Sequence, residues 1–242
     1  MFDHVTLRVA DLADATRAFA AVLDALEIKQ NTSTPTFSVW GNFALTQTDA
    51  EHPLARRVHV AFIAPTPAHV ERFSQAGIAA GFADDGPAGP RPQYADDYYA
   101  AFLKDRAGNS FEAVHRDGER PRGNIDHVAI RVNYVEASTA FYSTIADAAG
   151  LTIRPRTADR AAFSVGASDG TFIAIAGMPT DNVHVAFSGE DDDVRRFHAD
   201  AIAAGYRSNG EPGERPRYHD GYYAAFVLDP DANNIEVVNH NR

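Results

Sequence analysis

An internal duplication constrains the fold of this chain more than any other feature. Residues 86–115 and 210–239 are identical at 15 of 30 positions, and the shared residues include Glu112 and Glu236. The two stretches lie 124 residues apart in a chain of 242, so two copies of one unit account for its length. Self-similarity at this spacing predicts that one structural unit is built twice.

The dipeptide His-Val opens a strand-like stretch four times, twice in each half. The four histidines are His4, His59, His127 and His184. Because histidine is scarce and is a common metal ligand, its return at one place in a repeating unit indicates a positioned residue. A weaker repeat therefore lies inside each half and divides the chain into quarters.

The hydrophobic pattern predicts the same order of elements in each quarter. Alternation of apolar and polar residues predicts a strand at the start, and apolar residues at helical spacing follow it. Turn residues then separate further strands, as at Gly41-Asn42. For the first half we expect helices at 12–28 and 67–80 and strands at 2–9, 37–40, 43–46, 58–63, 98–103 and 110–115. Each quarter is thus a strand, a helix and further strands.

The polar stretch 117–124 contains proline and two glycines, so it is the predicted linker between the halves. It places an N-terminal module at 1–117 and a C-terminal module at 124–242. At 242 residues, two cores of ordinary domain size fit this division.

Composition excludes several classes of partner and site. The chain has 33 acidic and 22 basic residues and a net charge of −11, which would repel a nucleic-acid backbone. The lack of cysteine excludes disulfides and thiolate metal sites and leaves His, Asp and Glu as the strong ligands. No basic leader and no apolar run of membrane-spanning length is present. We therefore expect a cytoplasmic protein with no membrane or nucleic-acid partner.

The order of elements resembles the vicinal oxygen chelate superfamily, which includes glyoxalase I, extradiol dioxygenases, fosfomycin-resistance enzymes and bleomycin-resistance binders. The resemblance covers nearly the whole chain. It rests on Asp-His-Val near the start of each half and on a motif of Asp, Asn and Glu at each end. It implies an α+β fold in which four βαβββ units form two open-barrel modules in tandem.

The resemblance also implies a set of metal ligands. Relatives hold a divalent metal with a His on the first strand, a His on the fifth and a Glu on the last. Mapped within each half, this gives His4, His59 and Glu112, and His127, His184 and Glu236. In some relatives the quarters exchange partners, so that His4 joins His184 and Glu236 while His127 joins His59 and Glu112. The sequence leaves both groupings open.

Two imidazoles and one carboxylate leave about half of an octahedral ion's positions open, which suits Fe, Mn or Zn acting on a substrate. The strands at 44–48 and 171–175 lack the additional Glu of glyoxalase I relatives. The remaining set resembles that of extradiol dioxygenases and fosfomycin-resistance transferases.

Residues 218–236 resemble the extradiol signature, in which a His, a Tyr and Asp-Pro precede the Glu. By this resemblance His219 is the acid–base residue, a role that suits an imidazole near neutral pH. Phe226 replaces the signature Tyr, so Tyr222 or Tyr223 would supply a phenol, and Tyr223 is the candidate catalytic residue. The first half has Ala95 where His219 stands, which favours the C-terminal half as the active one.

Arg131, Arg215 and Tyr218 are candidates for substrate binding. Arg131 follows His127 by four residues on one strand face, as Arg8 follows His4. An inward arginine can pair a carboxylate or phosphonate, and the alternative is a salt bridge at the barrel rim.

Two hypotheses for function follow. The first is a metal-dependent enzyme that acts on a small substrate with vicinal oxygens, with extradiol-dioxygenase-like chemistry favoured over lyase, isomerase or thiol-transferase chemistry. The second is a non-catalytic binder of small molecules, similar to the bleomycin-resistance proteins. A homodimer is possible, and the sequence names neither the substrate nor the metal.

Overall fold

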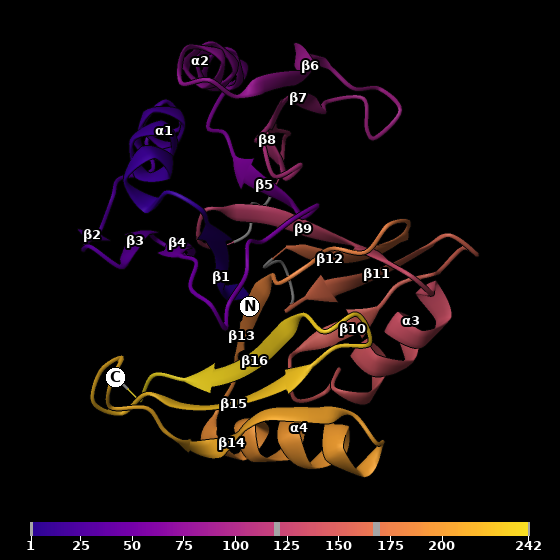
Figure 1. The fold of residues 1–242 in the computed structure, drawn as a ribbon. Helices are drawn as coiled ribbons and strands as arrows, with labels where there is room; N and C mark the ends of the chain where they lie inside the picture. The colour runs from indigo at the N-terminus through magenta and orange to yellow at the C-terminus, as the bar shows by residue number, and fades with distance from the viewer. Residues whose placement is uncertain (1, 119–121, 167–169, 242) are drawn as a thin grey trace.

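The computed structural model describes residues 2–118, 122–166 and 170–241 (Figure 1). Of the predicted linker 117–124, residues 119–121 lie outside this description. Four βαβββ units follow one another, as the sequence predicts. The first half comprises β1 (Phe2–Val9), α1 (Leu12–Asp24), β2 (Thr32–Ser33), β3 (Phe37–Trp40), β4 (Phe43–Gln47), β5 (His59–Ile63), α2 (Pro67–Ala79), β6 (Ala83–Pro90), β7 (Tyr99–Lys104) and β8 (Ser110–His115). The second half comprises β9 (Ile125–Val132), α3 (Val135–Thr144), β10 (Leu151–Ile153), β11 (Arg160–Val165), β12 (Thr171–Ala176), β13 (His184–Ser188), α4 (Asp191–Ala203), β14 (Arg207–Glu214), β15 (Tyr223–Leu228) and β16 (Asn234–Asn239).

Each of the two sheets combines one unit from each half of the chain. One sheet has the order β14-β15-β16-β13-β1-β4-β3-β2, and the other has the order β10-β11-β12-β9-β5-β8-β7-β6. The halves join where β1 pairs with β13 and β5 pairs with β9, both antiparallel (Figure 1). The first unit therefore shares a sheet with the fourth, and the second with the third.

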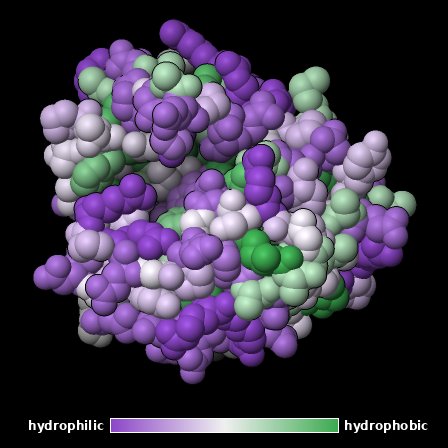
Figure 2. Space-filling view, turned by 60° about the horizontal axis from the view of Figure 1, so that its bottom comes forward, coloured by the Kyte–Doolittle hydropathy of each residue, from purple (hydrophilic) through white to green (hydrophobic). Residues whose placement is uncertain are grey.

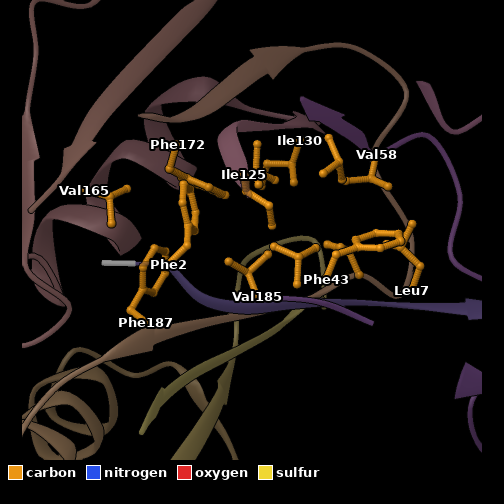
Figure 3. Close-up of a cluster of buried hydrophobic side chains, with 14 of the residues drawn as sticks. Phe2, Leu7, Phe43, Val58, Ile125, Ile130, Val165, Phe172, Val185 and Phe187 are labelled. Atoms are coloured by element: carbon orange, nitrogen blue, oxygen red, sulfur yellow. The ribbon is translucent and has the colours of Figure 1, made fainter. Parts of the chain in front are cut away.

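The main hydrophobic core lies between the two sheets (Figure 3). Aromatic rings cross from one sheet to the other: Phe187 lies 6.1 Å from Phe172, and Phe43 lies 5.1 Å from Phe62 between ring centroids. On β1 this core takes Val5 and Leu7, whose side chains are fully buried. Because side chains alternate along a strand, His4, Thr6 and Arg8 lie on the opposite face. The histidine-bearing faces of the two sheets thus point away from each other.

Two local differences from the predicted elements have clear causes. Helix α1 ends at Asp24 instead of residue 28, because Glu27 takes a left-handed φ of 65° and Ile28 N–H bonds back to Leu23 O. Strands β6 and β14 were not predicted, because glycine, proline and acidic residues disfavour strands. Both are sheet edges with register shifts, where such residues are tolerated.

The face shown in Figure 2 is mostly hydrophilic, with hydrophobic residues in small patches. Among the described residues, no helix has the length and apolar character needed to cross a membrane.

Candidate metal centres

The six candidate ligands form two compact groups, and each group draws on both halves of the chain. In one group, the His184 Nε2 atom lies 3.0 Å from His4 Nε2 and 2.9 Å from Glu236 Oε2, and His4 Nε2 lies 3.6 Å from that oxygen. We call this group the His4 centre. Its ligands come from the neighbouring strands β1, β13 and β16.

The second group, the His127 centre, has nearly the same dimensions. The His59 Nε2 atom lies 3.0 Å from Glu112 Oε2 and 3.2 Å from His127 Nε2, and His127 Nε2 lies 3.5 Å from the same oxygen. Its ligands come from β9, β5 and β8.

This arrangement decides between the two groupings that the sequence left open. The grouping within each half, with His127, His184 and Glu236 together, is wrong. The reason is strand pairing: β1 pairs with β13 and not with β5, which puts Thr6 opposite His184. The exchanged grouping is the one that the structure shows.

A carboxylate beside each first-strand histidine fixes how that ring is oriented. Asp3 Oδ1 lies 2.7 Å from His4 Nδ1, and Asp126 Oδ1 lies 2.9 Å from His127 Nδ1. Because a carboxylate only accepts, Nδ1 donates in both rings, and the neutral rings direct the Nε2 lone pair into the centre. This carboxylate–histidine arrangement is typical of metal ligands.

The donor sets fit a divalent cation. Bonds of about 2.0–2.2 Å that meet at right angles place neighbouring donors about 3 Å apart, close to the separations in both centres. Glu236 and Glu112 are almost fully buried, at 1% and 2% exposure, and a buried carboxylate requires a cation or hydrogen bonds. Among the described residues, each group contains three such ligands.

The charges of the His4 centre stabilise one another. Burial is the largest single effect on His4 and lowers its pKa, but Asp3 and Glu236 together outweigh it and the pKa of His4 is raised. Burial raises the pKa of Glu236, yet hydrogen bonds and charge from His184, His4 and Tyr222 leave it below its usual value. Glu236 is therefore a carboxylate at neutral pH, as a metal ligand must be.

The phenol beside each centre belongs to the tyrosine before the strand. Tyr222 OH donates to Glu236 Oε1 at 2.7 Å, and Tyr98 OH donates to Glu112 Oε1 at the same distance. Burial, followed by the neighbouring carboxylate, raises the pKa of Tyr222 well above its usual value, so this phenol stays a donor.

The candidate Tyr223 does not reach either centre. Its hydroxyl contacts Arg195 of α4 at 3.3 Å, because neighbouring residues at the start of β15 face opposite sides of the sheet. Tyr222, and not the predicted Tyr223, is the tyrosine that contacts a ligand of the His4 centre.

His219 lies near the His4 centre but does not contact its ligands. Its Nε2 atom lies 2.8 Å from His240 Nδ1, and His240 Nε2 lies 2.9 Å from Asp3 Oδ2. His219 thus reaches His4 through two intervening side chains. The sequence predicts that His127 and His184 lie together in the half that contains His219. In the structure, His184 belongs to the centre near His219, whereas His127 belongs to the other centre.

The three candidate substrate-binding residues do not lie together. Arg131 is exposed on β9, in the sheet of the His127 centre, whereas Arg8 is half-buried on β1 on the face of His4. Arg215 stacks 5.5 Å above the Phe226 ring and bonds to the Glu211 carbonyl, so a structural role occupies its guanidinium. Tyr218 is 52% exposed with its ring 4.8 Å from Tyr222, so it remains a candidate at the rim of the His4 centre.

The walls of the two centres are alike on one side and different on the other. Phe226 lies 6.2 Å from the His184 ring, as Phe102 does from His59. On the other side, the strand beside β1 presents Ala44 and Thr46, and the strand beside β9 presents Ile173 and Ile175 at the matching register positions. The His127 centre therefore has the more apolar wall.

Sequence reasoning missed the residues that support the ligands. Asp3 and Asp126 belong to the repeated Asp-His-Val, and the repetition of the aspartate was the signal that could have identified them. His240 and Arg116 occupy matching positions in the repeat and contact Asp3 and Asp126 respectively. Because His240 and Arg116 differ between the two copies, repetition could not identify them. Only the structure shows that they lie beside the centres.

Comparisons with known proteins agree with the fold. Residues 124–237 match the model of the Glyoxalase/Bleomycin resistance protein/Dioxygenase superfamily. Glyoxalase I from Zea mays is a similar solved structure, with a TM-score of 0.68 and 17% identity over 99% of this chain and 92% of that one. A putative dioxygenase from Bacillus subtilis subsp. subtilis str. 168 has a TM-score of 0.63 and 15% identity over 98% of this chain and 84% of that one.

Among curated proteins, none matches the sequence significantly. The second half matches the family model directly, the first half repeats the second, and both solved structures share the arrangement of nearly the whole chain. The second half of the chain therefore matches the glyoxalase, bleomycin resistance protein and dioxygenase superfamily, and the whole chain has the fold of the two solved structures.

Proposed function

We propose that this protein is a metal-dependent enzyme that acts on a small substrate with vicinal oxygens, and that the His4 centre is its main active site. The observation that carries this proposal is the convergence of three donor atoms about 3 Å apart, with Asp3 holding His4 in the ligand tautomer. Fe, Mn or Zn suits this donor set. A bound metal would polarise the substrate oxygens and leave about half of its positions open to them.

The chain's own residues have distinct roles in this proposal. Tyr222 holds Glu236 by a hydrogen bond and keeps its own proton. Phe226, Ala186, Ala224 and Val238 form an apolar cluster with Tyr222, which would exclude water from one side of the substrate. Arg8 is half-buried on the face of His4, about 13 Å along the strand, where it would contact an anionic group of the substrate.

His219 is the proposed proton carrier, and His240 and Asp3 connect it to the His4 centre. We place the chemistry at the His4 centre because this proton-carrying group adjoins it, whereas Ala95 and Arg116 stand at the matching positions of the His127 centre. Dioxygenase-type chemistry is the first candidate, because in the described part of the chain each centre groups two histidines with one glutamate, the set that resembles extradiol dioxygenases. Lyase, isomerase or thiol-transferase chemistry on the same centre is the second.

Metal content tests the proposal directly. We expect purified, metal-loaded protein to hold one equivalent of divalent metal for each centre, measured by elemental mass spectrometry. Glu236→Ala should remove the metal of the His4 centre, Glu112→Ala the metal of the His127 centre, and the double variant both. Less than about 0.2 equivalents in the unaltered protein, unchanged by these substitutions, would instead support a binder without metal.

Activity then distinguishes the reactions. Protein loaded with Fe(II) under anaerobic conditions would be mixed with aerated buffer and a panel of catechols, and separately with 2-oxoaldehydes and thiols. Oxygen uptake with a catechol supports the dioxygenase proposal, and conversion of an oxoaldehyde without oxygen uptake supports the alternative. In either case Glu236→Ala should abolish the activity and Glu112→Ala should retain most of it.

A further inference from the structure

The sheet face that contains the His127 centre also contains arginines farther along its strands. In this sheet β9, β12, β11 and β10 are neighbours in that order (Figure 1). Arg131 follows His127 by four residues on β9, so both side chains lie on one face, about 13 Å apart along the strand. Arg131 stands opposite Ile175 of β12, which stands opposite Arg160 of β11. Because opposite residues on paired strands share a face, Arg160 lies on this face as well.

A third arginine reaches the same face from the end of β10. Arg154 follows this strand directly, and its Nε atom donates to Ser164 Oγ at 2.6 Å. Ser164 stands opposite Thr171, and Thr171 stands opposite His127. This contact therefore lies two strands from His127, a distance of about 10 Å. The three arginines are called the arginine cluster: Arg131, Arg154 and Arg160.

A small apolar patch lies between the His127 centre and the arginine cluster. Ala129, Ala162 and Ile173 are buried and pack together apart from the main core, and Ile175 packs against them. On β9 the patch begins between His127 and the next residue of the same face. A ligand on this face would therefore meet metal ligands at one end, apolar side chains in the middle and guanidinium groups at the other end.

The arginine cluster has exposed guanidinium groups without acidic partners. Among the described residues, the ion pairs of arginine are made by others: Arg17, Arg57, Arg116, Arg195 and Arg196. Asp159, next to Arg160 in sequence, accepts from Thr157 Oγ1 at 2.6 Å. Acidic residues outnumber basic ones by 33 to 22, so the chain does not lack carboxylates. Like charges on one face repel each other, and a bound anion would relieve that repulsion.

The matching strands beside the His4 centre have different side chains. By strand register, Thr32 and Phe37 occupy the positions of Arg154 and Arg160. The third arginine does have a counterpart, Arg8 of β1. On these strands, one copy of the repeat therefore presents three cationic groups and the other presents one. The two faces are suited to ligands of different charge.

We propose that the arginine cluster and the apolar patch form a binding site for a small amphipathic anion. Such a ligand has an apolar body and, at one end, two or more negative charges on phosphate or carboxylate groups. Guanidinium groups bind these groups through paired hydrogen bonds. The apolar body lies over Ile173 and Ile175, and the remaining end points to the His127 centre. This inference goes beyond the proposed function, which concerns the His4 centre.

Calorimetric titration of the full-length protein, dialysed against a chelator, tests the site without any contribution from a cation. The probes are phenyl phosphate, isophthalate and inorganic phosphate. The first two carry their charge on phosphate and on carboxylates respectively, and the third lacks an apolar body. We expect one equivalent of an aromatic dianion to bind at least about fivefold more tightly than inorganic phosphate. The tighter of the two aromatic probes identifies the charged group.

Substitution of the arginine cluster locates the site. Replacing all three residues should weaken the binding of the aromatic dianion by at least about tenfold: Arg131→Gln, Arg154→Gln and Arg160→Gln. A charge-matched control removes three arginines from helices α1 and α4: Arg17→Gln, Arg195→Gln and Arg196→Gln. Because charges remote from the site are screened, the control should keep the affinity within about twofold.

Transfer of the arginines to the other copy provides a test that does not depend on a loss. Thr32→Arg with Phe37→Arg adds two guanidinium groups to the sheet that contains Arg8, and both positions are exposed. We expect this double variant to bind a second equivalent of the aromatic dianion. Far-UV circular dichroism identifies any variant that fails to fold.

Three outcomes would overturn this inference. They are the absence of saturable binding of both aromatic dianions, binding that the triple variant retains or that the control weakens equally, and inorganic phosphate bound as tightly as the aromatic probes. All titrations use protein without metal, so these outcomes leave the proposed function intact. Absence of metal binding or of activity would overturn the proposed function and leave this inference intact.

Discussion

Two neighbouring tyrosines show how strongly a single side chain's direction determines its role. Tyr222 is buried and donates to Glu236, whereas the hydroxyl of Tyr223 meets Arg195 at an exposed contact. Tyr222→Phe leaves one oxygen of a buried carboxylate without its donor, which we expect to lower the free energy of unfolding by about 1–3 kcal/mol. Urea denaturation measures this loss. Tyr223→Phe is the matched control and should change stability by less than about 0.5 kcal/mol; equal losses would contradict the assignment.

Residue identities were the part of the site that the sequence predicted best. All six ligand candidates lie in the two centres, because a duplicated chain shows each position twice and in the same context. The choice of Tyr223 failed because strand alternation depends on where β15 starts, and the pattern does not fix that residue. The partners of Asp3 and Asp126 come from distant parts of the chain, so no local pattern indicates them.

At the scale of elements, the two copies place different side chains at the same contact between a helix and a strand. In α2, a Cβ on Gly77 would lie 2.1 Å from Leu103 Cδ1, and Leu103 is buried with little room to move. In α4 the matching pair is Ala201 and Val227, so a larger helix residue meets a smaller strand residue.

We expect Gly77→Ala to destabilise the protein by about 1–3 kcal/mol through overpacking, although alanine is otherwise the better helix residue. Adding Leu103→Val should recover more than half of this loss, since the double variant reproduces the pair found in the other copy. The free energy of unfolding from urea titrations of both variants provides the measurement. A double variant less stable than Gly77→Ala alone would show that the clash is not the cause.

The turn between β15 and β16 contains a carboxylate that titrates in an accessible range. Burial raises the pKa of Asp229 from 3.8 to about 6, although Asn233 and Tyr142 donate to it. Between these values the folded protein binds more protons than the unfolded chain, so this group's contribution to stability falls as pH rises from 4 to 6. The total is on the order of 3 kcal/mol. Asp229→Asn should remove this slope from urea midpoints measured over that range.

An amide at position 229 also places N–H groups against the donors of Asn233, so this variant should be less stable at every pH. The pH slope, not the absolute stability, is therefore the readout. Asp14→Asn, at an exposed position of α1, is the control and should keep the slope. Retention of the full slope in Asp229→Asn would assign the titration to another group.

Element order was predictable because each unit has a strong hydrophobic pattern, and helix α2 ends where Gly81, at a φ of 93°, permits it. The edge strands β6 and β14 were not predictable, since their sequences are typical of loops. They are strands because they pair with β7 and β15 respectively.

At the scale of the whole molecule, the pairing of units makes each half incomplete by itself. In the residues 1–117, β1 and β5 belong to different sheets, and each has one of its two neighbouring strands, β13 or β9, in the other half. We expect a fragment of residues 1–117 to form a homodimer in which β1 of one copy pairs with β5 of the other. Light scattering after size-exclusion chromatography should give twice the fragment mass. A monodisperse, folded monomer would contradict the expectation.

The α+β fold with four βαβββ units in two tandem modules was predicted and is confirmed. The pairing of units was beyond the sequence, because the repeats make β1 resemble β9 and β5 resemble β13, so either pairing satisfies the same hydrophobic pattern. The two possible pairings differ in how the units are connected and in the contacts between distant segments, such as the ion pair of Arg57 with Asp181. Local periodicity contains no information about such contacts.

Pairing across the halves also changes what a single substitution can do. In a homodimer of one half, every altered residue would appear in both centres at once, so an improvement in one could not be separated from damage to the other. In the fused chain each codon affects one centre. Ala95 and Arg116 could therefore remain beside one candidate centre while His219 and His240 stand beside the other, so the surroundings of one centre can change while those of the other stay as they are.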